Sequence, residues 1–193
     1  MWLATWGIIA PCSVDGILGS FIRNAPAAAR KVALCDVGRA LYREQETISA
    51  ESVARLRAIW EQWIGISSSR AEEDRSDLAA FGWWFASPAL DPDWTLPELN
   101  RVLSSTGGLV EMHIEVVGKL AKLASQYSDD VASCIEKFIE QRDKWKVKAC
   151  KDSLRSAITA LNQSPAVRRA QGIVSTLVAR GWMDFRDLVL LDQ

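Results

Sequence analysis

Apolar residues recur at helical spacing along nearly the whole chain, and this periodicity constrains the fold more than any other feature of the sequence. Val14, Ile17, Leu18 and Phe21 form the first apolar stripe, and similar stripes return after each group of turn residues. Spacings of three and four residues place side chains on one face of an α-helix, whereas a strand needs strict alternation, which no segment shows. The sequence therefore predicts an all-α protein.

The expected helices follow a regular period. Those of odd number in chain order are expected to begin near residues 14, 50, 95, 129 and 165, at intervals of 34 to 45 residues. Two-helix units of this length stack side by side in solenoids of the HEAT and armadillo kind. We therefore expect a right-handed α-α superhelix of about five helical hairpins. A compact helical bundle is the alternative.

The composition is that of one globular domain. The chain has 193 residues, of which 49% are hydrophobic, enough for a sizeable core but too few to favour two domains. The net charge of −1 provides no global field for nucleic acid or an acidic membrane. The apolar start, residues 1–13, lacks the basic region of a signal peptide, and no apolar run is long enough to span a bilayer. We expect a cytoplasmic protein with helical hairpins over residues 14–193 and no membrane contact.

Turn and cap residues set the expected helix bounds. One helix is expected over Ala27–Arg43, and Ser49 is a good N-cap for the next. The polar residues Ser67–Ser69 are expected to separate that helix from one that leads into the sequence FGWWF. The sequence Thr95-Leu96-Pro97-Glu98 has the form of a capping box and predicts a helix start at Thr95. Gly107-Gly108 predicts its end.

The stretch FGWWFASPALDPDW, residues 81–94, holds three of the nine tryptophans. A central helix of a stacked array must be apolar on more than one face, which accounts for adjacent tryptophans without a ligand. Trp94 is expected to precede the cap at Thr95 and to pack on Leu99 as a hydrophobic staple. We therefore predict a core here in preference to an aromatic ligand platform, formed by Phe81, Trp83, Trp84, Phe85, Trp94 and Leu99.

A row of basic residues in QRDKWKVKACKDSLR is the strongest candidate for a binding site. Lys144, Lys148, Lys151 and Arg155 are spaced to lie on one stripe of a helix, where they could contact phosphates of a nucleic acid or another anion. The structural alternative is charge pairing with an acidic stripe on the preceding helix, or plain solvation. That acidic stripe consists of Glu136, Glu140 and Asp143.

The sequence contains no recognisable catalytic motif. His113 is the only histidine, and an acid–base site would pair it with a carboxylate such as Glu111, but a histidine at the edge of the core is the favoured interpretation. Trp145 and Asp152 are the candidates for the base-binding and catalytic groups of a HEAT-like DNA glycosylase. We expect the chain not to be an enzyme.

Cysteine usage predicts neither a metal site nor disulfides. No C-x-x-C pair is present, and the usual spacing of zinc ligands is absent. The cysteines are therefore expected to be buried thiols, and no cofactor is expected. They are Cys12, Cys35, Cys134 and Cys150.

Three segments resemble a known group of proteins: LAAFGWWFASPALDPDWTLPELNRVL, STGGLVEMHIEVVGKLAKLA and RGWMDFRDLVLL. They are similar to the helical C-terminal region of large, mostly uncharacterised bacterial multidomain proteins. Those proteins often carry an NTPase or SIR2-like module, and some look like components of defence systems. The similarity covers nearly the whole chain from DGILGSFI onward. It implies a HEAT- or armadillo-like helical fold and assigns no catalytic or ligand residues.

The functional expectation is a noncatalytic α-solenoid scaffold that binds another protein or self-associates, and that is a detached C-terminal part of a larger bacterial system. The apolar start would supply one interface through Trp2, Trp6, Ile8 and Ile9. The alternative is a nucleic-acid-binding repeat protein that uses the basic stripe, extended by Arg168 and Arg169.

Overall fold

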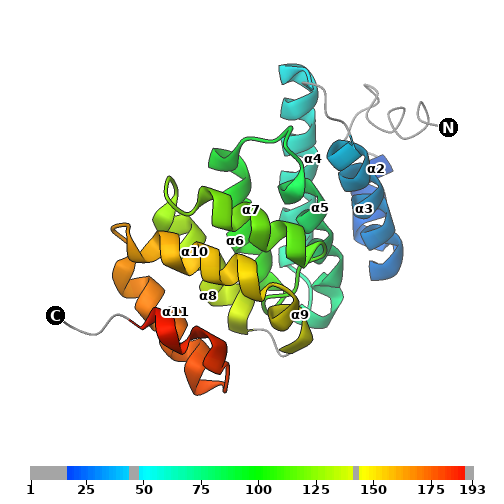
Figure 1. Ribbon diagram of the computed structural model, residues 1–193. Helices are drawn as coiled ribbons and strands as arrows, with labels where there is room; N and C mark the ends of the chain where they lie inside the picture. The colour runs from blue at the N-terminus through cyan, green and yellow to red at the C-terminus, as the bar shows by residue number, and fades with distance from the viewer. Residues whose placement is uncertain (1–16, 44–47, 141–143, 190–193) are drawn as a thin grey trace.

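A computed structural model describes residues 17–43, 48–140 and 144–189, and within these ranges every regular element is a helix (Figure 1). The expected all-α fold is confirmed. The α-helices are α2 (Ile17–Asn24), α3 (Ala27–Arg43), α4 (Ala50–Ser68), α5 (Phe81–Ala86), α6 (Pro92–Ser105), α7 (His113–Leu123), α8 (Ser128–Glu140), α9 (Lys144–Ala149), α10 (Lys151–Asn162) and α11 (Val167–Ala179). Two 3-10 helices complete the set, η1 (Glu72–Ala80) and η2 (Met183–Leu188).

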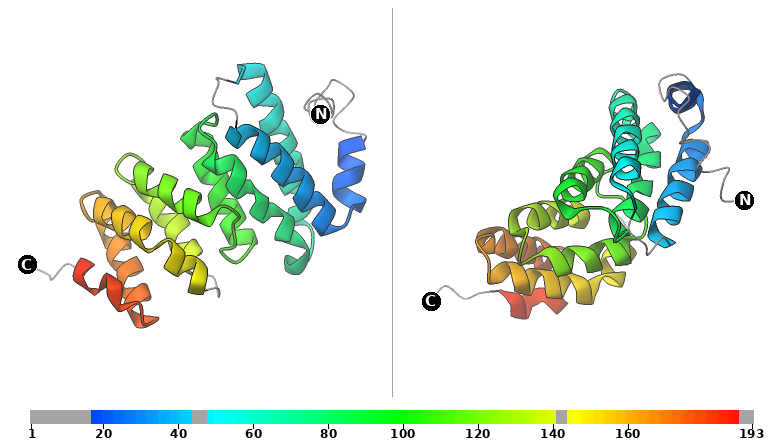
Figure 2. Two further views of the ribbon diagram at one scale, coloured as in Figure 1. Left: turned by 45° about the vertical axis from the view of Figure 1, so that its right-hand side comes forward. Right: turned by 90° about the horizontal axis from the view of Figure 1, so that it is seen from above.

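The elements alternate between two layers. In one layer α3 contacts η1 and α5, α5 contacts α7, α7 contacts α10, and α10 contacts η2. In the other layer α6 contacts α8 and α8 contacts α11, while hydrogen bonds join α4 to α6. Figure 2 shows the elements following one another from the N-terminal end to the C-terminal end. The pairs α5–α6, α7–α8 and α10–α11 thus pack within themselves and against the next pair, as in stacked hairpins. The hand of the superhelix stays a prediction.

Several predicted helix bounds are confirmed. The helix over Ala27–Arg43 has the expected limits. Ser49 caps α4, because its hydroxyl accepts a hydrogen bond from the backbone N–H of Ser52 at 3.2 Å. After α6, Gly107 and Gly108 have φ angles of 61° and 82°, which glycine adopts without steric cost. Cap and turn chemistry therefore identifies these helix ends correctly.

The predicted linker at Ser67–Ser69 is wrong, since α4 continues to Ser68 and Ser69 is its C-cap. The segment that follows is the 3-10 helix η1, where the sequence predicted an α-helix. Asp77, Leu78, Ala79 and Ala80 are consecutive and all buried. Helices α3, α4, α5 and α6 all contact η1, so tertiary packing around these four consecutive residues sets its geometry more than helical amphipathicity does.

The predicted helix start at Thr95 is also wrong. Helix α6 begins at Pro92 with Asp91 as its N-cap, whose carboxylate accepts the backbone N–H two residues on at 2.9 Å. Thr95 is buried in the first turn, where its hydroxyl donates to the Asp91 carbonyl at 3.0 Å. Trp94 consequently lies inside the helix and not in a staple. Its ring meets Phe81 edge to face, with ring centroids 5.9 Å apart.

The predicted core residues lie where the layers meet. Phe81, Trp84, Phe85 and Leu99 are completely buried, and the half-buried Trp83 and Trp94 pack against them. The ring of Trp60 from α4 lies 4.3 Å from that of Phe81, measured between centroids. The Trp84 indole N–H donates to the Leu34 carbonyl at 3.1 Å. The tryptophan-rich segment is therefore a structural core, as the sequence predicted.

Three cysteines are buried free thiols, as expected, while Cys12 lies outside the described residues. Burial raises the pKa of the Cys134 and Cys150 thiols to about 12. Burial also raises the pKa of Cys35. Because thiolates carry the reactivity of cysteine, these side chains are inert packing groups at neutral pH.

A buried ion pair joins three elements of the N-terminal half. The Asp77 carboxylate of η1 accepts hydrogen bonds from Arg30 of α3 and from the Trp63 indole of α4, each at 2.9 Å. The side chains of Arg30 and Asp77 are 2% and 0% exposed. The Arg30 guanidinium also donates to the Ala25 carbonyl at 2.5 Å. A charge so completely removed from water is tolerated only with such partners.

Replacing Asp77 with alanine should lower the free energy of unfolding by about 3–5 kcal/mol, because the Arg30 charge would remain buried without its counter-ion. The matched control is Asp36→Ala, which breaks an exposed pair with Arg39 and should cost less than about 1 kcal/mol. Urea denaturation measures both losses. Equal losses for the two variants would show that the buried pair does not stabilise the fold.

Candidate functional site

The predicted basic stripe is divided between two helices. Lys144 and Lys148 lie on α9 and are exposed, whereas Lys151 and Arg155 lie on α10 and are half-buried. The two helices are separated at Cys150, which is buried. The two halves of the stripe therefore have different surroundings.

The α10 half of the stripe is paired within the chain. The ammonium of Lys151 lies 3.4 Å from the carboxylate of Asp184, and the guanidinium of Arg155 lies 2.5 Å from the carboxylate of Asp187. Both acidic residues belong to η2. The hydrogen bond from Arg155 lowers the pKa of the Asp187 carboxyl, so this pair is ionised at neutral pH. These two cations are therefore less available for an external anion.

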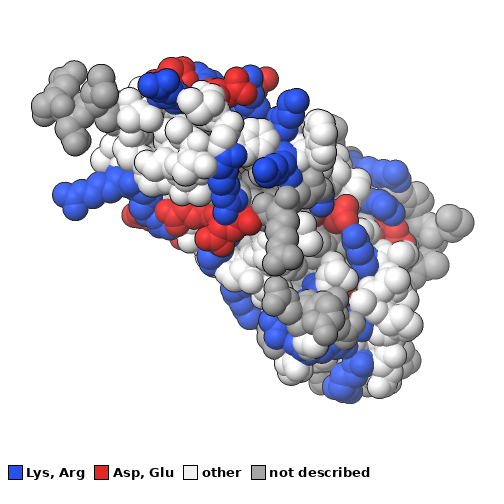
Figure 3. Space-filling view, turned by 90° about the horizontal axis from the view of Figure 1, so that it is seen from below, with Lys and Arg blue, Asp and Glu red and all other residues white. Residues whose placement is uncertain are grey.

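Among the described residues the acidic stripe predicted on α8 forms no ion pair with the basic stripe, although Glu140 lines the same cleft as Lys144. Glu136 pairs with Arg169 of α11 at 2.5 Å, and that hydrogen bond raises the pKa of the guanidinium. Asp143 lies outside the described residues. Figure 3 shows Lys and Arg side chains in separate groups across the face drawn there, with Asp and Glu side chains gathered in places among them. Arg168 is exposed, but Arg169 is engaged with α8.

Helix α9 also presents a large aromatic side chain to solvent. Trp145 is 76% exposed, whereas Trp60 and Trp84 are 0% exposed in the core. The ammonium of Lys148 lies 5.3 Å from the centroid of the Trp145 ring, within the range of a cation–π contact. We call Lys144, Trp145 and Lys148 the α9 surface. The sequence considered this tryptophan only as part of a glycosylase, because the apolar pattern alone does not show which tryptophan is left outside the core.

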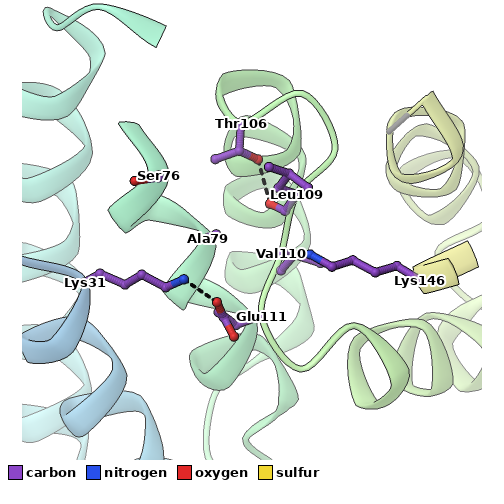
Figure 4. A pocket seen from close by; sticks show the side chains of 8 residues that line it. All are labelled: Lys31, Ser76, Ala79, Thr106, Leu109, Val110, Glu111 and Lys146. Carbon is purple, nitrogen blue, oxygen red and sulfur yellow. Dashed lines mark hydrogen bonds and ion pairs between the residues drawn. The ribbon is translucent and has the colours of Figure 1, made fainter. Parts of the chain in front are cut away.

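A cleft of about 410 Å³ lies beside α9 (Figure 4). Its walls come from α3, η1, the segment between α6 and α7, and α9 itself. Lys31 and Lys146 reach into it from opposite walls, as Figure 4 shows, and we call it the Lys31–Lys146 cleft. The lining residues are Lys31, Ser76, Ala79, Thr106, Leu109, Val110, Glu111 and Lys146.

The cleft carries a net positive charge. The ammonium of Lys31 lies 2.5 Å from the carboxylate of Glu111, and the two side chains are 38% and 39% exposed. Within the described part of the chain, no ion pair or hydrogen bond is found for the half-buried Lys146. Two ammonium groups therefore face one carboxylate. Sequence reasoning missed this site because its residues come from four separate segments with no common motif.

The loop that forms one wall of the cleft is held rigidly. The Glu111 backbone N–H donates to the Ala79 carbonyl at 2.8 Å. Met112 has a φ of 52°, a left-handed conformation that is strained for a residue with a side chain. Gly82 allows the close approach, since a Cβ atom there would lie 1.9 Å from the Glu111 carbonyl oxygen. The backbone of this wall is therefore fixed before any ligand arrives.

Lys119 is a partly buried amine with a different role. Burial lowers the pKa of its ammonium to about 8. A depressed lysine pKa can mark a functional group. Here, however, the ammonium donates to the carbonyls of Phe85 and Ser87 at 2.7 and 2.8 Å, at the end of α5. Lys119 thus caps a helix C-terminus.

The residues that the sequence suggested for catalysis lie in different surroundings. The carboxylate of Glu111, offered by the sequence as a partner for His113, is bound to Lys31. His113 begins α7, and its carbonyl accepts a hydrogen bond from the Cys150 thiol at 3.4 Å. Asp152 lies in an open cleft formed by α10 and η2, which Trp145 does not line. The pair proposed for a glycosylase therefore does not share this cleft.

Other sequence-predicted features fall outside these sites. Trp2, Trp6, Ile8 and Ile9 lie outside the described residues. Among the described residues, no group of three or more histidine, cysteine or acidic side chains is arranged to hold a metal ion. No helix in the same part of the chain combines the length and apolar character needed to cross a membrane.

Comparison with known proteins adds no relative. No family model matches the chain, and neither curated proteins nor solved structures include a significant match. The resemblance to the helical region of bacterial NTPase and SIR2-like proteins therefore stays a prediction.

Replacing Gly82 with alanine should destabilise the fold by at least about 2 kcal/mol, because the new Cβ would collide with the Glu111 carbonyl and displace the cleft wall. The control is Gly172→Ala in the exposed part of α11, where a Cβ meets nothing within 4 Å. That change should stabilise the protein by up to about 1 kcal/mol through helix propensity. Chemical denaturation of both variants measures the change in the free energy of unfolding, which should be a decrease for Gly82→Ala and an increase for Gly172→Ala. A stable Gly82→Ala protein would contradict the close approach.

Proposed function

We propose that this chain is a noncatalytic helical-repeat scaffold of the HEAT or armadillo kind, which binds another protein or a second copy of itself. The observation that supports the proposal most directly is the 76% exposure of Trp145 on α9. Tryptophan is the residue most enriched among the side chains that dominate binding energy in protein interfaces. Leaving its ring in water forgoes the stabilisation that burial would give. A protein partner would recover that stabilisation on binding.

The stacking of helices in two layers supports the same function. Repeat proteins of this architecture expose long surfaces on which a partner can lie. The α9 surface lies between two clefts, because Lys146 lines one of them while Lys144 and Val147 line another. A partner that covers Trp145 would thus reach hollows on both sides. We further propose a cytoplasmic, bacterial setting as part of a larger system, which is what the family resemblance implies.

Nucleic-acid binding is the second candidate, and the placement of Trp145 between Lys144 and Lys148 favours it. An exposed aromatic ring can stack on a base while neighbouring lysines contact phosphates. The internal pairing of Lys151 and Arg155 counts against an extended contact, because two of the four predicted cations are already engaged. Only a weak, short contact is therefore expected from the α9 surface.

Photo-crosslinking from position 145 tests the scaffold function. Trp145 is replaced by the photoreactive residue p-benzoylphenylalanine in cells of the source organism, and adducts are identified by mass spectrometry. We expect a covalent protein adduct, because an interface centred on the exposed ring places the probe against the partner. The control is the same replacement of Tyr42, another exposed aromatic residue, on α3.

The adduct identifies the kind of partner. A different protein or a covalent dimer of this chain, formed from position 145 and not from position 42, supports the scaffold. A nucleic-acid adduct would transfer support to the second candidate. No adduct, or equal adducts from both positions, would overturn the α9 surface as an interface.

The second candidate makes a separate prediction about salt. If only Lys144 and Lys148 contact phosphates, the logarithm of the affinity for a single-stranded oligonucleotide should fall with the logarithm of salt concentration with a slope of about −1.4. Trp145→Ala should remove about 1–3 kcal/mol of binding through lost stacking. Fluorescence anisotropy at several salt concentrations measures both. Absence of binding at low salt would exclude this function.

A further inference from the structure

We infer that the Lys31–Lys146 cleft binds a carboxylate group presented by an acidic segment of the protein partner. The inference rests on the proposed scaffold function and adds to it the chemistry of the partner. Lys146 directly follows Trp145 on α9, so one short helix carries both the exposed tryptophan and a wall of the cleft. A segment that occupies the cleft would therefore also bring its flanking residues to the exposed tryptophan.

The cleft already contains one half of the proposed recognition. Lys31 binds the Glu111 carboxylate at 2.5 Å, and this pair shows how a lysine in these walls holds a carboxylate. Figure 4 shows the Lys146 side chain extending into the same space from the opposite side. Lys146 makes no ion pair with the described residues, so its charge is available to a second carboxylate.

The fixed charge of Glu111 selects the kind of anion. With both lysines and this carboxylate ionised, the walls carry one net positive charge, which a single carboxylate neutralises. A phosphate dianion would exceed that charge and would be repelled by the carboxylate already bound to Lys31. The cleft thus favours a carboxylate over the dianion of a phosphate monoester.

The floor of the cleft indicates what accompanies the carboxylate. Ala79 and Val110 are buried and form an apolar base, while Leu109 is 40% exposed at the rim. A volume of about 410 Å³ is at the small end of ligand pockets, enough for one acidic side chain and an apolar neighbour. We therefore expect a partner motif in which Asp or Glu lies next to an aliphatic residue.

The rigidity of the walls favours binding. The contact of Gly82 with the Glu111 carbonyl and the left-handed Met112 fix the loop before the ligand arrives. The Thr106 hydroxyl donates to the Leu109 carbonyl at 2.6 Å and closes the same loop at its start. Binding to a wall that is already ordered avoids the entropic cost of ordering it.

Peptide selection tests this inference. Random peptides displayed on phage are selected against the complete wild-type chain, the Lys146→Glu variant and the Lys122→Glu variant. Lys122 is exposed on α7, so its replacement makes the same change of charge away from the cleft. Circular dichroism and thermal unfolding establish that each variant is folded before selection.

The wild-type chain and Lys122→Glu should both enrich peptides with Asp or Glu beside an aliphatic residue. Lys146→Glu should bind those peptides at least about tenfold more weakly, because an attraction becomes a repulsion. Equal binding to Lys146→Glu, or selection of peptides without acidic residues, would overturn the inference. If inorganic phosphate displaced the peptides as effectively as acetate, the assignment to a carboxylate would be wrong.

The same variants separate this inference from the proposed function. If the Lys146→Glu variant gives the same photo-adduct from position 145 as the wild type, that result would support the scaffold function and contradict a role of the cleft in binding the partner. If acidic peptides bind through Lys146 but position 145 yields no adduct, the cleft binds carboxylates and the α9 surface is not an interface. If Lys146→Glu abolishes both the peptide binding and the adduct, the two proposals are supported together.

Discussion

The carboxylate of Asp77 is the group on which the N-terminal half of the structure depends. It lies in η1 with no exposure to solvent, and it neutralises Arg30 of α3 while it accepts the indole N–H of Trp63 from α4. Three elements are thereby held together around one buried ion pair. Because η1 continues directly into α5, this anchor also sets the position of Gly82 against the Glu111 carbonyl. The wall of the Lys31–Lys146 cleft is a consequence of that position.

The buried tryptophans also join neighbouring helices, through hydrogen bonds from their indole N–H groups. An indole ring contributes a large apolar surface and one N–H group that needs an acceptor. Trp60 donates to Glu98 at 2.7 Å and so joins α4 to α6, and Glu98 in turn binds Arg101 at 2.9 Å. Trp84 donates to a carbonyl of α3. Trp60 and Trp84 therefore link neighbouring elements as well as filling the core.

The sequence predicts the fold well wherever one local rule acts alone. Apolar periodicity and caps such as Ser49 place the starts of α4, α8 and α11 within two residues of those expected near 50, 129 and 165. The prediction fails where a residue of a local pattern is engaged in a tertiary contact instead. Thr95 and Glu98 have the spacing of a capping box, but Glu98 is needed by Trp60, and Asp91 caps the helix instead. Only the tertiary structure shows this competition.

The sequence names the residues of the α9 surface, but the division of the basic stripe was beyond prediction for a related reason. Lys144, Lys148, Lys151 and Arg155 look equivalent in the sequence, but η2 folds back on α10 and supplies carboxylates to the last two alone. The partner of a charge on α10 therefore lies about a whole repeat away in the chain, a distance at which no spacing rule operates. Glu140 of α8 lines the same cleft as Lys144, but no ion pair is found for the exposed lysines of α9 among the described residues. One run of basic residues thus contains two paired cations on α10 and two exposed cations on α9. Binding to a partner is proposed only for the exposed ones, because their charge is not already neutralised by a carboxylate of the described chain.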